Sequence, residues 1–468
     1  MDVVRIVGLW LAWLAVLCAF QIVVAARVQP QRPDTVLNWT SGATGEPITA
    51  CGQNPNAFKP RLADPNMNEH VAYDSEYYIS IAASGYDDPS VQAFYPDGPP
   101  FSGVPVCDTA VDYISLNYAF MPGYPMAMRP VMALAGMLPF TSGLSETAKA
   151  TLAGIVVSAL GGLLAMLALA RLMAFLERRR KAAAGDSEAV GPWGGSAGLR
   201  AGLYLLVFPT GFYLAQVYSE GLFVGLAFMA CAMAVERKIL PAAGLAVLAT
   251  LVRPVGVFLA LPLAWAAFQT IRDSWGTVRA SWREPRTWRL AVPAVVTLAP
   301  VLTFAAWYWS SLGEKWRLVE SGFFTRSFDL PKSIDLWQKS LASLLSGVDK
   351  TAPDGTYGVF TTGGATLTAP SMVYITLELL ALGLGVVACI WLFRRMPGVA
   401  LFGLGVILLS AGSSGAQGMD RYVIAVPAIF LMVAWFGRHV VVDRVWVMAS
   451  TLLMGMLAML FTFGFWVA

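Results

Sequence analysis

Apolar stretches alternate with polar segments along this chain of 468 residues. About half of the chain lies in runs near the length of about twenty residues with which a helix crosses the hydrocarbon core of a bilayer. The pattern therefore predicts an all-α polytopic membrane protein with about eleven transmembrane helices. The expected spans are 6–26, 150–175, 199–211, 221–235, 239–252, 255–269, 290–310, 371–393, 399–409, 422–436 and 445–466.

Two long polar segments interrupt this pattern, and we expect both to leave the membrane as loops of a single transmembrane domain over 1–468. The first loop, 27–148, contains an apolar stretch at 117–140 whose prolines and arginine suit a hydrocarbon helix poorly. We expect that stretch to lie along the outer membrane interface. The second loop, 311–370, contains an amphipathic segment at 334–345.

Basic residues set the expected orientation. Arginine and lysine cluster directly after the spans 150–175, 221–235 and 371–393, and in the loop 270–289. Such clusters stay on the cytoplasmic side of a membrane. All of them share one side only if 117–140 does not cross. We therefore expect a multi-pass protein of the cell membrane, with a cytoplasmic N-terminus and both large loops extracytoplasmic.

Composition narrows the possible classes. With 57% hydrophobic and 13% charged residues and a mean hydropathy of +0.61, the chain is not a soluble domain. It has no P-loop or dinucleotide-binding glycine motif, so neither a nucleotide nor a nucleic acid is an expected partner. Cys51 and Cys107 share the first loop and are a disulfide candidate if that loop faces an oxidising compartment.

The stretch HVAYDSEYYISIAASG, at 70–85, has apolar residues at helical spacing. Asp74 precedes the run where an N-cap residue would sit, and Gly85 follows it where a C-cap glycine would. One interpretation is that Asp74 only caps a short interfacial helix. A second interpretation depends on the other polar residues that the topology brings to the same side.

Four polar clusters share the outer side in this topology. They are the acidic group from Asp74 to Asp88, the turn 117–125, the turn Tyr218-Ser219-Glu220, and the two helix-end arginines Arg253 and Arg421. Each has a structural alternative. Arg253 could snorkel or neutralise a helix end, Arg421 could pair with Asp420 or Asp74, and Glu220 could be a solvated turn residue.

Taken together, these clusters point to chemistry. Carboxylates and arginines at membrane depth are costly unless they are paired or line a water-filled cavity. An arginine presents a fixed fork to phosphate oxygens, and a carboxylate can take the proton of an attacking hydroxyl. The set suits a transfer reaction whose leaving group is a phosphate. His70 and His439 have no ligand partners nearby in the sequence, so no metal or other cofactor is expected, although the acidic group at 74–88 could hold a divalent cation.

Five blocks then resemble a known family in order. They are DSEYYISIAASGY (74–86), NYAFMPGYP (117–125), FPT with YSE (208–220), RPVG (253–256) and RY (421–422). The order of these blocks resembles that in the family of the GPI-anchor second mannosyltransferase (PIG-V-like), whose members are GT-C membrane glycosyltransferases. The segments 30–68 and 311–369 do not align with it. The Ala-, Arg-, Gly- and Trp-rich composition is typical of a high-GC bacterial protein, so we expect a bacterial member.

The resemblance implies a GT-C fold and an inverting transferase that moves mannose from a polyprenyl-phosphate donor to a hydroxyl on the extracytoplasmic face. Asp74 matches the family's essential loop aspartate and would be the catalytic base or a carboxylate that orients the acceptor. We assign Arg253 and Arg421 to the donor phosphate from their charge and topology. The substrate-binding residues expected from the matching blocks are Glu76, Tyr86, Asn117, Tyr124, Glu220 and Tyr422.

The acceptor stays open between a glycolipid, a cell-wall glycan and a protein hydroxyl, with membrane lipids as surrounding partners. A transporter or flippase of an anionic lipid-linked sugar is the alternative class, because it would also need outer arginines. Paired broken helices near the bilayer midplane would favour it. A GT-C-like scaffold without activity is a third interpretation, against which the intact Asp74 argues.

Overall fold

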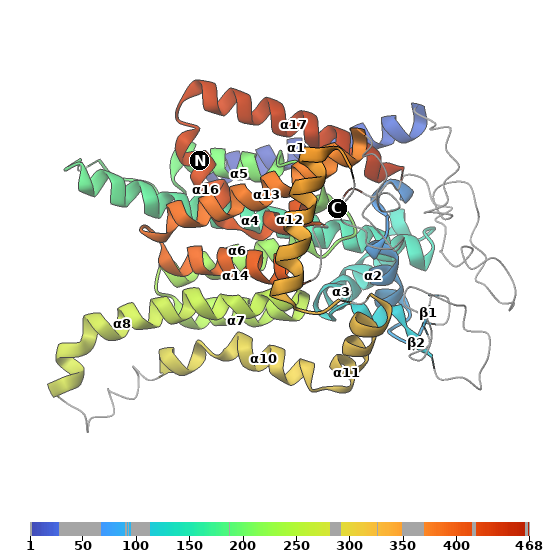
Figure 1. The fold of residues 1–468 in the computed structure, drawn as a ribbon, viewed down its shortest axis with the longest axis horizontal. Coiled ribbons are helices and arrows are strands. Elements are labelled where there is room, and N and C mark those ends of the chain that lie inside the picture. Colours follow the sequence, from blue (N-terminus) through green and yellow to red (C-terminus); the bar gives the residue numbers. More distant parts are fainter. Residues whose placement is uncertain are drawn as a thin grey trace, which may run out of the picture.

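A computed structural model describes residues 2–27, 67–88, 91, 93–94, 113–186, 188–280, 292–324, 326–348, 369–413, 418–463 and 467. The chain is a multi-pass helical membrane protein, as its apolar pattern predicts (Figure 1). Among the described residues, five helices are long and apolar enough to cross a bilayer, or up to seven if each of two bent helix pairs is one span. The five are Asp2–Arg27 (α1), Glu146–Ala183 (α4), Pro254–Ser274, Met372–Phe393 and Val440–Thr462 (α17).

The two bent pairs are Val292–Tyr308 with Ser311–Phe323, at 74°, and Met419–Ala425 with Pro427–Phe436, at 80°. In the second pair, Pro427 stands at the start of α16 (Pro427–Phe436). Proline has no N–H to continue the hydrogen bonds of the preceding turn, which accounts for the break at this position. The short helix α15 (Met419–Tyr422) therefore has its own direction.

Four further expected spans correspond to short helices. These are α5 (Gly195–Leu206), α6 (Glu220–Val235), α7 (Ile239–Val252) and α14 (Pro397–Gly412), with 12, 16, 14 and 16 residues. At about 1.5 Å per residue they measure about 18–24 Å, less than the hydrocarbon core of about 30 Å. The expected number of about eleven spans stays a prediction.

The shortness of α6, α7 and α14 bears on the depth of the polar residues at their ends. One end of each lies next to a basic loop, at Glu236–Lys238 or at Arg394 and Arg395. If those loops lie at the cytoplasmic surface, the opposite ends of the three helices are recessed below the outer surface. Those opposite ends are Glu220, Val252 and Gly412.

Helix α4 runs through the bundle and packs against α5, α6 and α3 (Gly123–Met137). Where α4 meets α6, the backbones of the two helices are in direct contact. A Cβ added to Gly161 would lie 2.2 Å from the carbonyl oxygen of Gly221, and one added to Gly225 would lie 2.4 Å from that of Gly161. Small residues permit such close helix packing within membranes. This contact fixes the first turn of α6, and with it Glu220, against α4.

The polar elements gather at one end of the bundle, opposite the basic end of α4 and the end of α8 (Ala260–Ala280) (Figure 1). They include α2 (Asp74–Ala83), η3 (Leu116–Ala119), α3, α11 (Ser311–Leu318) and a two-stranded antiparallel pairing of β1 (Ala93–Phe94) with β2 (Ile114–Ser115). This arrangement places the described parts of the first loop and the start of the second together. The interfacial position expected for 117–140 stays a prediction.

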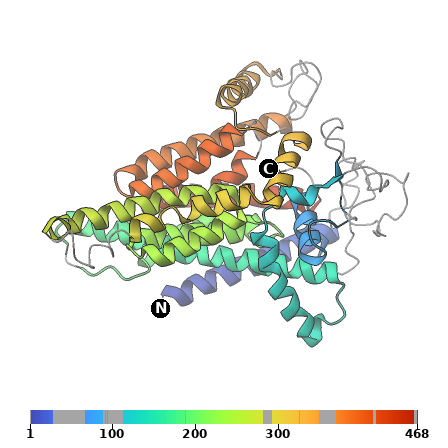
Figure 2. The same ribbon diagram turned by 90° about the horizontal axis from the view of Figure 1, so that it is seen from below.

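The amphipathic segment expected at 334–345 is the helix α12 (Leu330–Ser346). Asp329 caps its N-terminus by accepting a hydrogen bond from the backbone N–H of Lys332 at 3.0 Å, and Gly347 ends it with a φ of +69°. The helix runs across the neighbouring helices rather than along them (Figures 1 and 2). It packs on α13 (Ala369–Phe393) and α14.

Candidate active site

Four charged side chains from separate elements meet at the polar end of the bundle, and we call Asp74, Glu220, Arg253 and Arg421 the charged cluster. The Nη1 atom of Arg421 lies 3.2 Å from Oδ2 of Asp74, and its Nε lies 3.3 Å from Oε1 of Glu220. Nη1 of Arg253 lies 2.5 Å from the same Oε1. The structure thus joins a residue of the first loop to one 347 positions later in the chain.

Burial differs within the charged cluster. The side chain of Glu220 is 2% exposed and that of Arg421 is 9% exposed, whereas Asp74 is 29% exposed. Two carboxylates and two guanidiniums balance in charge, which offsets the cost of removing them from water. Asp74 is the member most open to an incoming molecule. Glu220 is the one held deepest, between the two arginines.

These contacts decide between the interpretations left open by the sequence. Arg421 pairs with Asp74 and Glu220 rather than with Asp420. Glu220 is the first residue of α6 and is buried, so its interpretation as a solvated turn residue is wrong. Arg253 does stand at a helix end, directly after α7, but its guanidinium binds Glu220.

The interpretation of Asp74 as an N-cap is also wrong. The helix α2 begins at Asp74, the residue before it is Tyr73 with a φ of +50°, and no side chain caps the start. Since the Asp74 carboxylate is not used by the backbone, it is available for Arg421. The C-terminal end of α2 has the expected cap glycine, because Gly85 has a φ of +96° and its N–H donates to the carbonyl of Ile81 at 3.1 Å.

Aromatic rings surround the guanidinium of Arg421. Its Cζ lies 5.3 Å from the ring centre of Tyr422, 5.6 Å from that of Tyr218 and 5.8 Å from that of Tyr213. Arg253 lies 5.3 Å from the Tyr422 ring as well. Cation–π contacts of this kind stabilise a buried guanidinium and restrict its direction. Tyr422, expected as a substrate-binding residue, is thus placed between the two arginines.

Two hydroxyl groups tie α2 to the turn before α6. Tyr78 donates to Oγ of Ser219 at 2.9 Å, and Tyr218 donates to the carbonyl of Ala72 at 2.9 Å. Both pairs connect residues more than 140 positions apart. These hydrogen bonds fix the positions of Asp74 and Glu220 relative to each other. They explain why the YSE block and the Asp74 block belong to one site.

The remaining predicted residues lie around α2 rather than in the charged cluster. Asn117 is fully buried and donates to Oγ of Ser80 at 2.9 Å, while Tyr86 donates to the carbonyl of Phe120 at 2.8 Å. Burial raises the pKa of the Tyr86 hydroxyl. Tyr124 is also fully buried and donates to the carbonyl of Gly154 at 2.8 Å. These side chains position the loop.

Glu76 is buried in the first turn of α2. Substrate contact by Glu76, Tyr86, Asn117 and Tyr124 stays a prediction.

The second loop contributes residues that the sequence did not reveal. Lys315 of α11 donates to the Tyr118 hydroxyl at 2.9 Å and lies 3.5 Å from the Asp87 carboxylate, while Tyr118 donates to Asp87 at 2.7 Å. Partial burial raises the pKa of Tyr118, although Lys315 opposes this shift. Glu320 follows in a π-turn and pairs with Arg326 at 3.9 Å. No sequence period signals a contact between segments this far apart.

Metal and disulfide sites are not defined by the structure. Within the described ranges, no group of three His, Cys, Asp or Glu side chains could hold a metal ion. Asp87 and Asp88 bind Tyr118 and Ser80 instead, at 2.7 Å each. The expected absence of a metal and of another cofactor stays a prediction. Cys51 and Cys107 lie outside the described residues.

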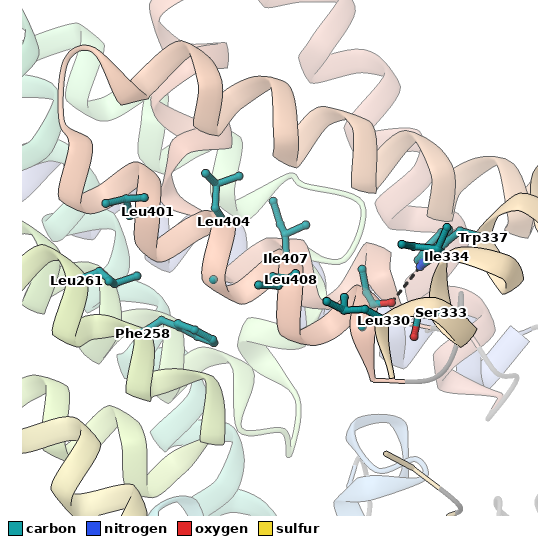
Figure 3. A pocket seen from close by; sticks show the side chains of 13 residues that line it. Phe258, Leu261, Leu330, Ser333, Ile334, Trp337, Leu401, Leu404, Ile407 and Leu408 are labelled. Atoms are coloured by element: carbon teal, nitrogen blue, oxygen red, sulfur yellow. Dashed lines mark hydrogen bonds between the residues drawn. The ribbon is translucent and has the colours of Figure 1, made fainter. Parts of the chain in front are cut away.

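An apolar groove of about 490 Å³ lies between α12, α14 and the segment where η6 (Pro254–Leu259) joins α8. Figure 3 shows Leu401 and Leu404 of α14 opposite Leu261 and Phe258, with Leu330, Ser333 and Trp337 of α12 at the other end. The indole of Trp337 donates to the carbonyl of Ala411 at 3.1 Å. Along α14 the lining runs from Leu401 to Gly412, about 16 Å at about 1.5 Å per residue.

No family model and no curated protein matches this sequence. Among solved structures, the chain is similar to archaeal oligosaccharyltransferase AglB from Archaeoglobus fulgidus in complex with an inhibitory peptide and a dolichol-phosphate, with 13% identity and a TM-score of 0.41, over 96% of this chain and 56% of that chain. It is similar to the apo form of the Archaeoglobus fulgidus enzyme with 13% identity and a TM-score of 0.40, over 97% and 55%. This chain therefore spans about half the length of those chains. At this identity, the matches assign neither substrate nor activity to it.

The Glu220 bridge generates a first prediction. Glu220→Gln leaves two buried guanidiniums without their shared counter-charge, so we expect a loss of about 3 kcal/mol or more in stability. The midpoint of thermal unfolding in detergent measures it. The matched control is Glu146→Gln, since Glu146 is 74% exposed in its pair with Lys149 and should change stability by less than about 1 kcal/mol. Equal midpoints for the two variants would show that the bridge is not stabilising.

Proposed function

We propose that this protein is a GT-C-type glycosyltransferase that moves a sugar, mannose by family resemblance, from a polyprenyl-phosphate donor to a hydroxyl acceptor. The reaction takes place on the extracytoplasmic face of the cell membrane. The observation that carries the proposal is the charged cluster, in which the partly exposed carboxylate of Asp74 contacts one of two guanidiniums that Glu220 bridges. The order of the sequence blocks supports the same interpretation.

The geometry suggests how donor binding prepares the reaction. The donor phosphate binds to the forks of Arg253 and Arg421, which match phosphate oxygens in shape and charge. In doing so it replaces Asp74 as a partner of Arg421, because both anions compete for the same guanidinium. The Asp74 carboxylate is then free to face the acceptor hydroxyl. Before the donor binds, the base is neutralised by its ion pair.

Transfer then proceeds as a single displacement. The acceptor oxygen forms a bond to the anomeric carbon, the bond from that carbon to the phosphate oxygen breaks, and the hydroxyl proton moves to Asp74. The leaving polyprenyl phosphate gains negative charge next to the two arginines, which stabilise it electrostatically. A single displacement without a covalent intermediate inverts the configuration at the anomeric carbon.

Glu220 and Tyr422 have supporting roles in this proposal. Glu220 holds both guanidiniums through one oxygen, so it sets their separation and direction. Its other carboxylate oxygen is buried and has no hydrogen-bond partner among the residues that the structure describes. That oxygen can accept a hydrogen bond from a hydroxyl of the sugar if the cluster opens. Tyr422 closes the site from the side of α15.

We assign the apolar groove to the polyprenyl chain of the donor. One wall begins at Phe258, five positions after Arg253, and the groove ends at Gly412, where α14 stops. A chain in this groove would have its phosphate end toward the arginines and its apolar part along about half of the hydrocarbon thickness. The acceptor stays open between a glycolipid, a cell-wall glycan and a protein.

A transporter or flippase of an anionic lipid-linked sugar is the second candidate. The two bent helix pairs favour it, because broken helices line the substrate sites of many transporters. The two functions differ in their need for a base. A transporter would keep its activity without a proton acceptor at Asp74, whereas the transferase would not.

The base assignment predicts the effect of Asp74→Asn. A carboxamide cannot accept the hydroxyl proton, so we expect sugar transfer to fall about 100-fold or more in membranes supplied with polyprenyl-phosphate mannose. The variant should fold normally, because an amide oxygen still accepts a hydrogen bond from Arg421. Asp335→Asn on the exposed face of α12 is the matched control. Full transfer by the Asp74 variant would reject the assignment of Asp74 as the base.

The phosphate assignment predicts that Arg421→Lys is not conservative. A point charge replaces a two-pronged contact, so we expect the KM for the donor to rise about tenfold. Arg272→Lys, at a side chain that is 60% exposed on α8, should leave the KM unchanged. The measurement is initial transfer rate against donor concentration. Indistinguishable KM values in the two variants would place the phosphate elsewhere.

The groove assignment predicts the effect of Leu408→Trp. Leu408 is 49% exposed and lines the groove, so the larger ring fills it. Each buried methylene contributes about 0.8 kcal/mol, and excluding two of them should raise the KM for a long-chain donor about tenfold. A donor with a short chain should be affected less. Leu452→Trp, at a 69% exposed position of α17, is the control. A rise independent of chain length would contradict the assignment.

A further inference from the structure

Glu378 is a buried carboxylate that the proposed reaction does not use. It lies in the middle of α13 and is 1% exposed. Its Oε1 accepts the backbone N–H of Gly418 at 2.7 Å, and its Oε2 accepts those of Met419 and Asp420 at 2.6 and 3.2 Å. A single side chain therefore binds three consecutive backbone donors of a segment forty positions away.

Those three N–H groups open the short helix α15. The first N–H groups of a helix have no partner within it, and an unpaired donor in a low-dielectric interior is costly. The local sequence offers no cap, because the residue before the helix is Gly418, with a φ of +75° and no side chain. Glu378 supplies the missing acceptor from another helix.

The same short helix carries Arg421, the next residue after the three bound amides. On its other side, Thr210 donates to the carbonyl of Asp420 at 3.0 Å. The break at Pro427 separates this segment from α16, so that helix does not hold it in line. The direction of the Arg421 side chain toward Asp74 and Glu220 thus depends on contacts made by α13 and by the turn at Thr210.

We propose that Glu378 is a positioning residue: by capping α15 from within the membrane, it aims Arg421 into the charged cluster. The assignment of Arg421 to the donor phosphate rests on the proposed function. The capping of α15 by Glu378, and its effect on the direction of the Arg421 side chain, do not. Glu378 touches neither donor nor acceptor in this proposal. It acts on the site through the backbone of α15.

The cap is tested without any substrate. The measurement is hydrogen–deuterium exchange of the full chain in detergent. In Glu378→Gln the amides at 418–420 should exchange about tenfold faster or more. The reason is that a carboxamide has one acceptor oxygen and turns an N–H donor toward the same backbone N–H groups. The matched control is Glu177→Gln, a carboxylate that is also buried and lies at the basic end of α4 with Arg180 and Arg438. Unchanged exchange at 418–420 would overturn the proposal, as would equal changes in both variants.

A double-mutant cycle with Arg421→Lys tests whether Glu378 sets the direction of the Arg421 side chain. Glu378→Gln should raise the KM for polyprenyl-phosphate mannose about tenfold when Arg421 is intact, but at most about twofold in the Arg421→Lys background, where the fork is already lost, because neighbouring groups that act as one unit are not additive. Equal rises in both backgrounds would show a general loss of structure and overturn the positioning role. Faster exchange at 418–420 in a protein that transfers no sugar would support the cap and reject the proposed function.

Discussion

The sharing of one Glu220 oxygen by Arg253 and Arg421 is the interaction on which the polar end of this protein depends. Two guanidiniums so close together repel each other, and in a poorly hydrated environment this repulsion is weakly screened. The buried carboxylate between them offsets it and leaves Asp74 to balance the remaining charge. The result is a group of four ions whose charges balance.

The rest of the bundle holds this group in place by contacts that are individually simple. Glycine contacts bring α6 against α4 and fix Glu220. Tyr78 and Tyr218 tie α2 to the turn before α6, and Glu378 caps the helix that carries Arg421. If the basic loops lie at the cytoplasmic surface, the short helices α6, α7 and α14 end below the outer surface and leave the cluster recessed.

Several of these features were predictable from the sequence and others were not. The apolar runs predicted a helical membrane protein, and the motif order grouped Asp74, Glu220, Arg253 and Arg421, which the structure brings together. The N-cap interpretation of Asp74 failed, because Asp is favourable both at the N-cap and in the first turn of a helix, and the sequence does not distinguish the two positions. Lys315 and Glu378 were missed, since neither belongs to a local pattern.

The sequence by itself determined where the chain is apolar, where proline and glycine end or bend its helices, and which charged residues stand at those ends, because these properties depend on neighbours within a few positions. Only the tertiary structure decided which carboxylate pairs with which arginine and which side chain caps α15. Those pairings join residues 33 to 347 positions apart. They form because a charge or an N–H buried among packed helices must find its partner wherever the fold provides one.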